Sequence, residues 1–145
     1  MRNLPRGQFP GKAIPHYVPA TDTVELPHRR TFLAEWRFYK TLFHELAHST
    51  GHASRLARKS LTETPGMAAS GLKTYCEEEL VAEMTAVFLG ASAGIIEDGF
   101  ENSAAYLKGW MDVLKVRDHR KWLVRAASEA QKAADYILGV NPLPL

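Results

Sequence analysis

Apolar positions in the first half of the chain recur with the period of an α-helix. Between about residues 31 and 50 they are spaced alternately by four and three, which predicts a helix there. These positions are Phe32, Trp36, Tyr39, Phe43 and Leu46, and they are expected to face the core. Gly51 follows at a place where helices often end. Residues 53–74 have a weak pattern and a Pro-Gly turn signal, so they predict a long connection.

Three further helices are predicted in the second half. The next covers about residues 75–91 and ends before Gly94, and its inner stripe is Cys76, Leu80, Met84, Val87, Phe88 and Ala91. A third helix is expected to begin at Asn102 or Ser103, and a fourth at Asp118, because these residues are good N-caps. Small alanines at spacings of three and four in the fourth helix indicate close packing against its neighbours.

The chain before the first helix has a different character. Residues 16–27, HYVPATDTVELP, predict two short strands around a turn at residues 20–22, and the prolines favour an edge position. Residues 1–15 are rich in proline and glycine and predict an irregular arm or the remnant of a linker. We therefore predict an α+β, mostly helical fold with a small N-terminal β element, forming one domain over residues 16–145.

Composition supports a soluble globular domain and narrows its partners. The chain has 145 residues, of which 46% are apolar and 23% charged. Its net charge of +2 is too small to predict nucleic-acid binding, and a single cysteine, Cys76, excludes an internal disulfide. No apolar run approaches the length that spans a bilayer, and the start has no apolar signal core. A cytoplasmic location without membrane contact is expected.

The strongest chemical signal is HELAH at residues 44–48, an HExxH motif in the last turns of the first predicted helix. Positions i and i+4 differ by about 40° around a helix, so His44 and His48 share a face and reach one metal ion. Glu45 is rotated by about 100° from His44, which suits a general base beside a metal-bound water. The alternative is two surface histidines near a helix C-terminus.

Zinc requires at least one more protein ligand. The metzincin pattern is excluded, because its third histidine would fall on Ser54. In the next predicted helix, Glu79 and Glu83 are an i, i+4 pair that would meet the histidines if the two apolar stripes pack together. One would bind metal and the other would orient a ligand histidine, an order that spacing alone leaves open. His52 is a further candidate for the third ligand.

The other titratable residues near these motifs receive structural interpretations. Glu77 and Glu78 are expected on a solvated face, where acidic residues favour a helix N-terminus. Cys76 is expected to be a buried, inert thiol. Three residues are candidate hydrogen-bond donors to a developing oxyanion, and they are Tyr39, Tyr106 and His119.

Five segments in this order resemble the zincin-like metallopeptidase domain of ArdC-type antirestriction proteins, plasmid- and phage-associated proteins that are also found around TraC-type primases. They are HYVPATDTVELP, FHELAHSTGHASRLAR, EELVAEMTAVFL, AAYLKGWMDVLK and ASEAQKAADYIL, and together they span about residues 16–138. Family members often have HELGHWTGH, so Ala47 and Ser49 are departures, and Ser49 is expected to alter the cleft wall.

The resemblance implies metal ligands at His44, His48 and Glu79, with Glu45 catalytic and Glu83 as the orienting residue. It implies a zinc-dependent peptidase of protein or peptide substrates, or alternatively a DNA-associated antirestriction module whose metal site is structural or vestigial. Relatives usually carry an upstream single-stranded-DNA-binding domain, so DNA binding is expected only through such a domain. The oligomeric state is left open.

Overall fold

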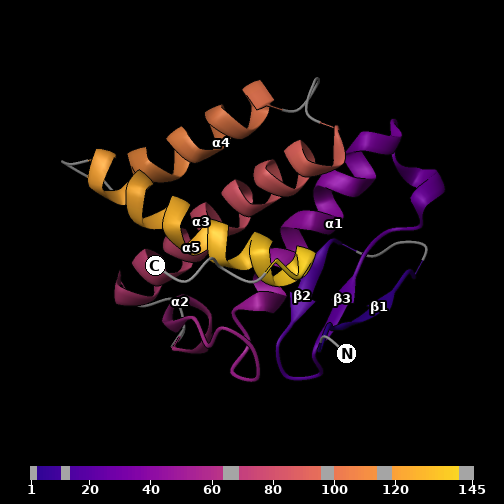
Figure 1. Ribbon diagram of the computed structural model, residues 1–145, viewed down its shortest axis with the longest axis horizontal. Helices are drawn as coiled ribbons and strands as arrows, with labels where there is room; N and C mark the ends of the chain where they lie inside the picture. The colour runs from indigo at the N-terminus through magenta and orange to yellow at the C-terminus, as the bar shows by residue number, and fades with distance from the viewer. Residues whose placement is uncertain (1–2, 11–13, 64–68, 96–99, 114–118, 141–145) are drawn as a thin grey trace.

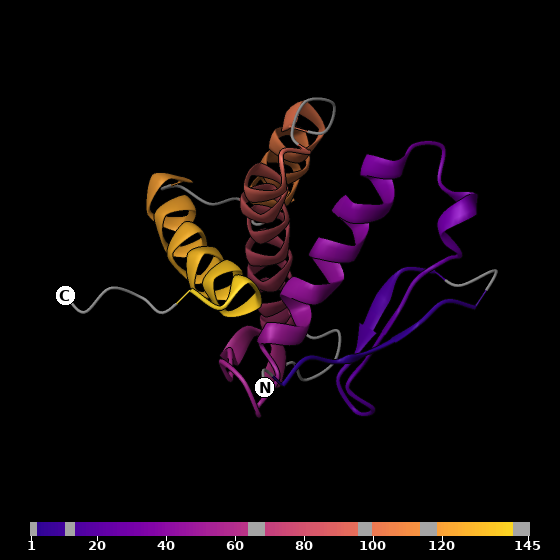
Figure 2. The ribbon, with the colours of Figure 1, turned by 45° about the vertical axis from the view of Figure 1, so that its right-hand side comes forward.

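The computed structural model describes residues 3–10, 14–63, 69–95, 100–113 and 119–140, and these form a small sheet and a helical layer (Figure 1). The elements in order are β1 (Arg6–Gln8), β2 (His16–Val18), β3 (Thr23–Glu25), the 3-10 turn η1 (Arg29–Thr31), α1 (Glu35–Thr50), α2 (Lys59–Thr62), α3 (Ala69–Ala93), α4 (Phe100–Val113) and α5 (His119–Leu138). The sheet lies beside α1, and Figure 2 shows α3 between α1 and α5. The α+β, mostly helical class is confirmed.

The sheet has the strand order β1-β3-β2, so β2 lies at an edge as the prolines predicted, whereas β3, which the same prediction covered, is the central strand. β2 and β3 are antiparallel, with Tyr17 opposite Val24, and form the predicted hairpin. Asp22 in the turn has a φ of 51°, in the left-handed region that aspartate tolerates. β1 pairs in parallel with β3, although it lies in the segment predicted to be irregular. Its three residues are all exposed, so no apolar alternation marks the strand.

Two apolar cores lie on opposite sides of the pair formed by α1 and α3. The first lies between the sheet and α1 and contains Tyr17, Val24, Leu26 and Phe38. The second lies among α3, α4 and α5 and contains Leu80, Val81, Met111, Ala126 and Ala130. The buried alanines of α5 let that helix approach α3 closely, as predicted.

The face that α1 presents to the core differs in part from the expected stripe. Phe38 is buried, whereas Trp36 and Phe43 are only half-buried. The sheet covers α1 along Phe38, Tyr39 and Leu42, and this rotates Trp36 toward an open groove on the other side. Helical period alone does not say which side of a partly covered helix meets the sheet.

Helix boundaries also shift from those predicted. α3 begins several residues earlier than expected, at Ala69, and α4 begins at Phe100, so Asn102 and Ser103 lie within its first turn rather than at its cap. Asp118, the predicted cap of α5, lies outside the described residues. Gly94 after α3 has a φ of +72°, the left-handed conformation expected of a C-terminal glycine. No described helix combines the length and apolar character needed to cross a bilayer.

Gly51, at the end of α1, is required for a different reason from Gly94 at the end of α3. Its backbone stays right-handed, with a φ of −76°. A Cβ at this position would lie 2.9 Å from Nη2 of Arg58 and 3.1 Å from the Cβ of Leu61. Glycine therefore allows the returning chain to approach the end of α1, which brings Arg58 into the interior.

A second arginine ties the returning chain to the sheet. The buried Arg55 side chain donates two hydrogen bonds, of 2.8 and 2.7 Å, to the two carboxylate oxygens of Asp22. The Tyr17 hydroxyl donates a third, of 2.8 Å, to Asp22. The Arg55 hydrogen bond holds the pKa of Asp22 below its usual range. These contacts fix the β2–β3 hairpin against the segment that follows α1.

Candidate metal centre

The C-terminal turns of α1 face the middle of α3, and this packing brings histidines and glutamates together. Both helices run through the interior, so each polar side chain between them needs a partner. His44 and His48 lie one turn apart on α1, and Glu79 of α3 reaches both of them. Glu79 and His48 are buried, and His44 is half-buried.

The three facing side chains present atoms at the spacing of metal ligands. Nε2 of His44 lies 3.2 Å from Nε2 of His48 and 3.3 Å from Oε2 of Glu79. Oε1 of Glu79 lies 3.2 Å from Nε2 of His48. Ligands at 2.0–2.1 Å from a tetrahedral ion are about 3.3–3.4 Å apart, so two imidazoles and one carboxylate fit a divalent cation with a further position open.

His44 is held from its other ring nitrogen by the second predicted glutamate. Nδ1 of His44 lies 3.1 Å from Oε2 of Glu83. Burial raises the pKa of Glu83, but the hydrogen bond from His44 and the charge of Lys40 outweigh it, so the pKa falls to about 2. Glu83 is therefore ionised at neutral pH and accepts the bond, which leaves Nε2 of His44 facing the site. Lys40 Nζ lies 3.2 Å from the other Glu83 oxygen.

His48 is held in the same way by Glu78, which was expected on a solvated face and is instead buried. Nδ1 of His48 lies 3.2 Å from Oε1 of Glu78. Arg58 donates from Nε and Nη2 to the two oxygens of this carboxylate, at 2.9 and 2.6 Å, and Ser60 donates a bond of 2.6 Å. Burial raises the pKa of Glu78, yet the hydrogen bonds and charges of Arg58 and His48 lower it to about 2.

The arginine that holds Glu78 is itself anchored to α1. Arg58 Nη1 donates to the Thr50 hydroxyl at 2.7 Å, and Nη2 donates to the carbonyl of Ala47 at 2.9 Å. Arg58 is only 5% exposed, so its charge needs the Glu78 carboxylate. The end of α1, the returning chain and α3 are thus joined at the back of His48.

The sequence did not identify Glu78 because a single buried apolar stripe was expected on α3, with its other sides exposed to solvent. In the structure, several sides of α3 are covered by neighbouring helices. Leu80, Val81 and Ala82 are consecutive and all buried, so α1, α2 and α5 leave this part of the helix little solvent-facing surface. This apolar run was the available signal, because a helix that is apolar all round is buried all round. A carboxylate within it then requires a buried cation, and Arg58 supplies one.

Glu45 lies beside the ligand atoms and is not one of the three that converge. It is 7% exposed, and burial raises its pKa although the two histidines lower it. It lines the clefts on both sides of His44, as Tyr106 does. A carboxylate whose pKa is raised toward neutrality is suited to exchange protons.

Two tyrosines border the site, one of them among the predicted donors. The Tyr106 hydroxyl of α4 donates a 2.8 Å hydrogen bond to Oε2 of Glu79, and its ring meets the His44 ring edge to face. Tyr75, which the sequence did not suggest, lines the same cleft of about 390 Å³. Tyr39 instead packs against the sheet core, and His119 begins α5.

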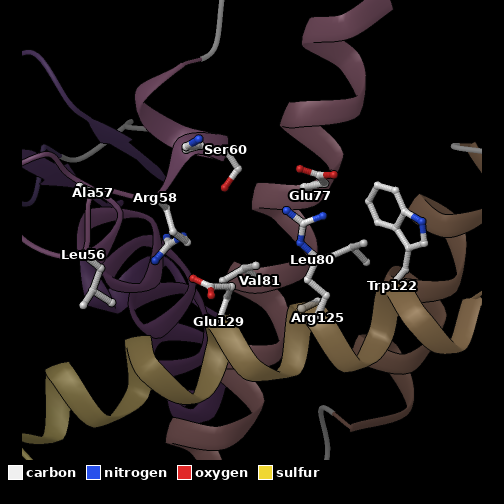
Figure 3. A pocket seen from close by; sticks show the side chains of 12 residues that line it. Leu56, Ala57, Arg58, Ser60, Glu77, Leu80, Val81, Trp122, Arg125 and Glu129 are labelled. Atoms are coloured by element: carbon white, nitrogen blue, oxygen red, sulfur yellow. The ribbon is translucent and has the colours of Figure 1, made fainter.

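The candidate ligand His52 lies away from the three ligand atoms, and so do Ser49 and Glu77. Nδ1 of His52 contacts the Ser54 hydroxyl at 2.7 Å, and His52 does not join the trio. Ser49 is fully buried and donates to the Leu46 carbonyl, so it does not form the cleft wall. Glu77 lines a separate hollow of about 290 Å³ between α3 and α5, where Figure 3 shows it near Trp122 and Arg125.

An HExxH helix beside a small edge-exposed sheet, with a glutamate from the next long helix, defines a metallopeptidase-type domain of zincin architecture. The family model for zincin-like metallopeptidases matches residues 10–129, and the chain belongs to this family.

Similar proteins place this domain in longer chains. The chain is 39% identical over 122 residues to DNA primase TraC of Escherichia coli. The matched region covers 84% of this chain and 8% of that protein. It resembles the crystal structure of the antirestriction ArdC protein from the R388 plasmid in its Mn(II)-bound form, with a TM-score of 0.71, 38% identity and coverage of 93% of this chain and 47% of that one. The metal-free ArdC structure gives a TM-score of 0.70 at 40% identity. The Mn(II)-bound relative supports a divalent metal in this fold.

The ligand set predicts distinct effects for Glu79 and Glu83. We expect about one divalent ion per chain, lost on His44→Ala, His48→Ala or Glu79→Ala, because two remaining ligands hold a metal poorly. Glu83→Ala should keep the ion with about 10–100-fold weaker affinity, the usual effect of losing a partner of a ligand histidine. Competition with a chromophoric chelator measures these affinities. If Glu83→Ala loses the metal and Glu79→Ala retains it, Glu83 is the ligand and Glu79 is the residue that orients the histidine.

The ionised pairs predict how the metal-free chain responds to pH. Burial alone lowers the pKa of His48, but the hydrogen bonds that its ring donates to Glu78 and Glu79 raise it from 6.5 to about 10. Its stabilising contribution is complete below 6.5 and is lost as pH rises toward 10. Glu78 and Glu83, lowered from 4.5 to about 2, contribute above 4.5 and lose this as pH falls toward 2. Urea unfolding in chelator should show greatest stability between about pH 4.5 and 6.5; a metal-free chain that gains stability from pH 7 to 9 would contradict this.

Glu78 and Arg58 predict a separation of stability from metal affinity. Glu78→Gln or Arg58→Met alone should destabilise the fold by about 3–5 kcal/mol, because each leaves a buried charge without its partner. The double variant removes both charges and should recover much of this loss. It should still bind metal about 10–100-fold more weakly, because His48 no longer faces a carboxylate. Unfolding curves and chelator competition on the folded double variant test this, and an unchanged affinity would show that Glu78 has no part in the metal site.

Proposed function

We propose that this domain is a zinc-dependent hydrolase of peptide bonds. The observation that carries the proposal is the convergence of His44, His48 and Glu79 beside the buried Glu45, at the floor of an open cleft. Three protein ligands with one open position are typical of catalytic zinc, whereas structural zinc is usually enclosed by four. The nitrogen and carboxylate donors also suit Zn²⁺.

The reaction follows from the roles that these side chains are placed to take. A bound zinc ion would polarise both the attacking water and the scissile carbonyl. Glu45 removes a proton from the water, whose oxygen then forms a bond to the carbonyl carbon. As the C–N bond breaks, Glu45 returns the proton to the leaving nitrogen. The Tyr106 hydroxyl lies beside Glu79 in the same cleft, and its single O–H would turn from Oε2 of Glu79 to the carbonyl oxygen as negative charge develops there.

The edge strand supplies a means of aligning an extended peptide. Pro15, His16 and Tyr17 line the cleft that also contains His44 and His48. β2 is bonded to β3 on one side only, so among the described strands its other edge has no partner. A peptide added there would be held mainly by main-chain hydrogen bonds, which fit many sequences.

A second candidate function follows from the names of the relatives. They include an antirestriction protein and a DNA primase, both concerned with DNA by their names, and this chain covers less than half of each. The alternative is a DNA-associated antirestriction module in which the metal holds α1 and α3 together without catalysis. Tight single-stranded-DNA binding is expected only through a domain upstream of the family domain, because the net charge is +2.

Glu45→Gln separates catalysis from metal binding. The variant should keep zinc and its stability, because Glu45 is not among the converging ligands, and should lose hydrolysis by at least about 100-fold, because the proton acceptor is removed. The assay incubates the zinc-loaded chain with a broad mixture of peptides and detects new amino termini by mass spectrometry. Cleavage by the unaltered chain that Glu45→Gln abolishes supports the hydrolase. A zinc-loaded, folded chain without any Glu45-dependent cleavage favours the structural role.

A further inference from the structure

A second groove leaves the metal centre on the side away from β2. It has a volume of about 520 Å³ and shares His44, Glu45 and Tyr106 with the β2 side of the cleft. From there it follows α1 toward that helix's N-terminus, past Lys40, Arg37 and Trp36. We call this stretch the α1 groove. A chain that lies along β2 and passes the ligand atoms would continue into it.

The two cations of the α1 groove, Lys40 and Arg37, differ in whether a carboxylate neutralises them. Lys40 is paired with Glu83, which itself holds His44, so this cation and anion offset each other. Arg37 is exposed, and its guanidinium lies 5.2 Å from the centre of the Trp36 ring. Among the described residues no carboxylate lies within ion-pair distance of Arg37, in contrast to the arginines at positions 29, 55 and 58. The cation is therefore held in place by an aromatic ring and left open to an external anion.

The position of Arg37 on α1 sets its distance from the reacting bond. It precedes His44 by seven residues, or two turns, which is about 10.5 Å along the helix. Lys40 precedes His44 by four residues, or about 6 Å. An extended peptide advances about 3.3 Å per residue, so these cations lie two to three residues from a carbonyl at the metal centre.

We propose that the α1 groove is a specificity site that selects peptide substrates with an acidic side chain two or three residues from the scissile bond, on one side of that bond. The proposal rests on the proposed peptidase function. Arg37 would pair with the carboxylate, and the Trp36 ring would cover the carbons of the neighbouring side chain. Backbone alignment on β2 would then supply affinity for many sequences, and the α1 groove would supply the preference among them.

The test measures binding, so that it does not depend on hydrolysis. The 145-residue chain with Glu45→Gln, loaded with zinc, is titrated against fluorescein-labelled nine-residue peptide pools with otherwise uncharged positions. The positions two and three residues from a central Gly-Leu bond carry Asp, Asn or Lys, on either side in turn. Arg37→Glu is compared with Arg120→Glu, which reverses an exposed charge at the start of α5 outside the groove. A dT oligonucleotide serves as the nucleic-acid probe.

We expect the Asp pools to bind more tightly than the Asn pools on one side of the bond, by about two- to five-fold, as exposed ion pairs do. Arg37→Glu should remove this preference and favour Lys, whereas Arg120→Glu should keep it. Equal binding of the three pools, absence of binding by all of them, or an Asp preference unchanged in Arg37→Glu would overturn the proposal. Tighter, Arg37-dependent binding of the oligonucleotide would also overturn it, because the groove would then be a nucleic-acid site.

Failure of this proposal is distinct from failure of the peptidase. Glu45-dependent cleavage by the unaltered chain, without a charge preference in either binding or cleaved sequences, would leave the hydrolase and remove the specificity site. An Arg37-dependent preference for Asp without any cleavage would leave an acidic-peptide binding site and remove the hydrolase.

Discussion

The pairing of histidines on α1 with glutamates on α3 is the constraint on which the rest of the structure depends. Glu78, Glu79 and Glu83 are all buried, and each faces at least one of the two histidines. A buried carboxylate without a partner is costly, so sliding one helix past the other by a turn would leave charges unpaired at both ends. Apolar contacts stabilise the packing of α1 against α3, but the charge pairs determine how the two helices are aligned along their axes. The metal-binding geometry is a consequence of that alignment.

Much of this arrangement was predictable because helical spacing is rigid. The four-residue spacing of HExxH places His44 and His48 on one face, and the same spacing in α3 turns Glu79 and Glu83 toward them. The hairpin of residues 16–27 and the glycine after α3 were equally local signals. What could not be predicted depends on contacts distant in sequence. Glu78 is buried because α3 is covered on several sides, Arg58 enters because Gly51 lacks a side chain, and β1 exists only because β3 offers it an edge.

The segment after α1 explains how a helix end, a sheet and a second helix become one rigid site. Arg55 bonds to Asp22 in the hairpin turn, and three residues later Arg58 bonds to Glu78 on α3. Two arginines in one short stretch therefore hold the edge strand on one side and the His48 orienting carboxylate on the other. Sequence analysis treated this stretch as a weakly patterned connection, because its structure lies in ion pairs and not in hydrophobic periodicity. Its function in the fold is to fix β2 relative to the ligands.

The cleft that results has two arms of different chemistry meeting at His44, Glu45 and Tyr106. On one arm β2 presents main-chain donors and acceptors, which distinguish little among sequences. On the other arm the main-chain groups of α1 beyond its first turn are engaged within the helix, so a ligand would meet mainly side chains such as Trp36 and Arg37. Under the proposed function, alignment on β2 and selection by α1 would therefore be separated along the cleft by the secondary structure of its walls. Substitutions on the exposed face of α1 would then change which ligands are preferred without disturbing the buried charge pairs, because those pairs lie on the side of α1 that meets α3.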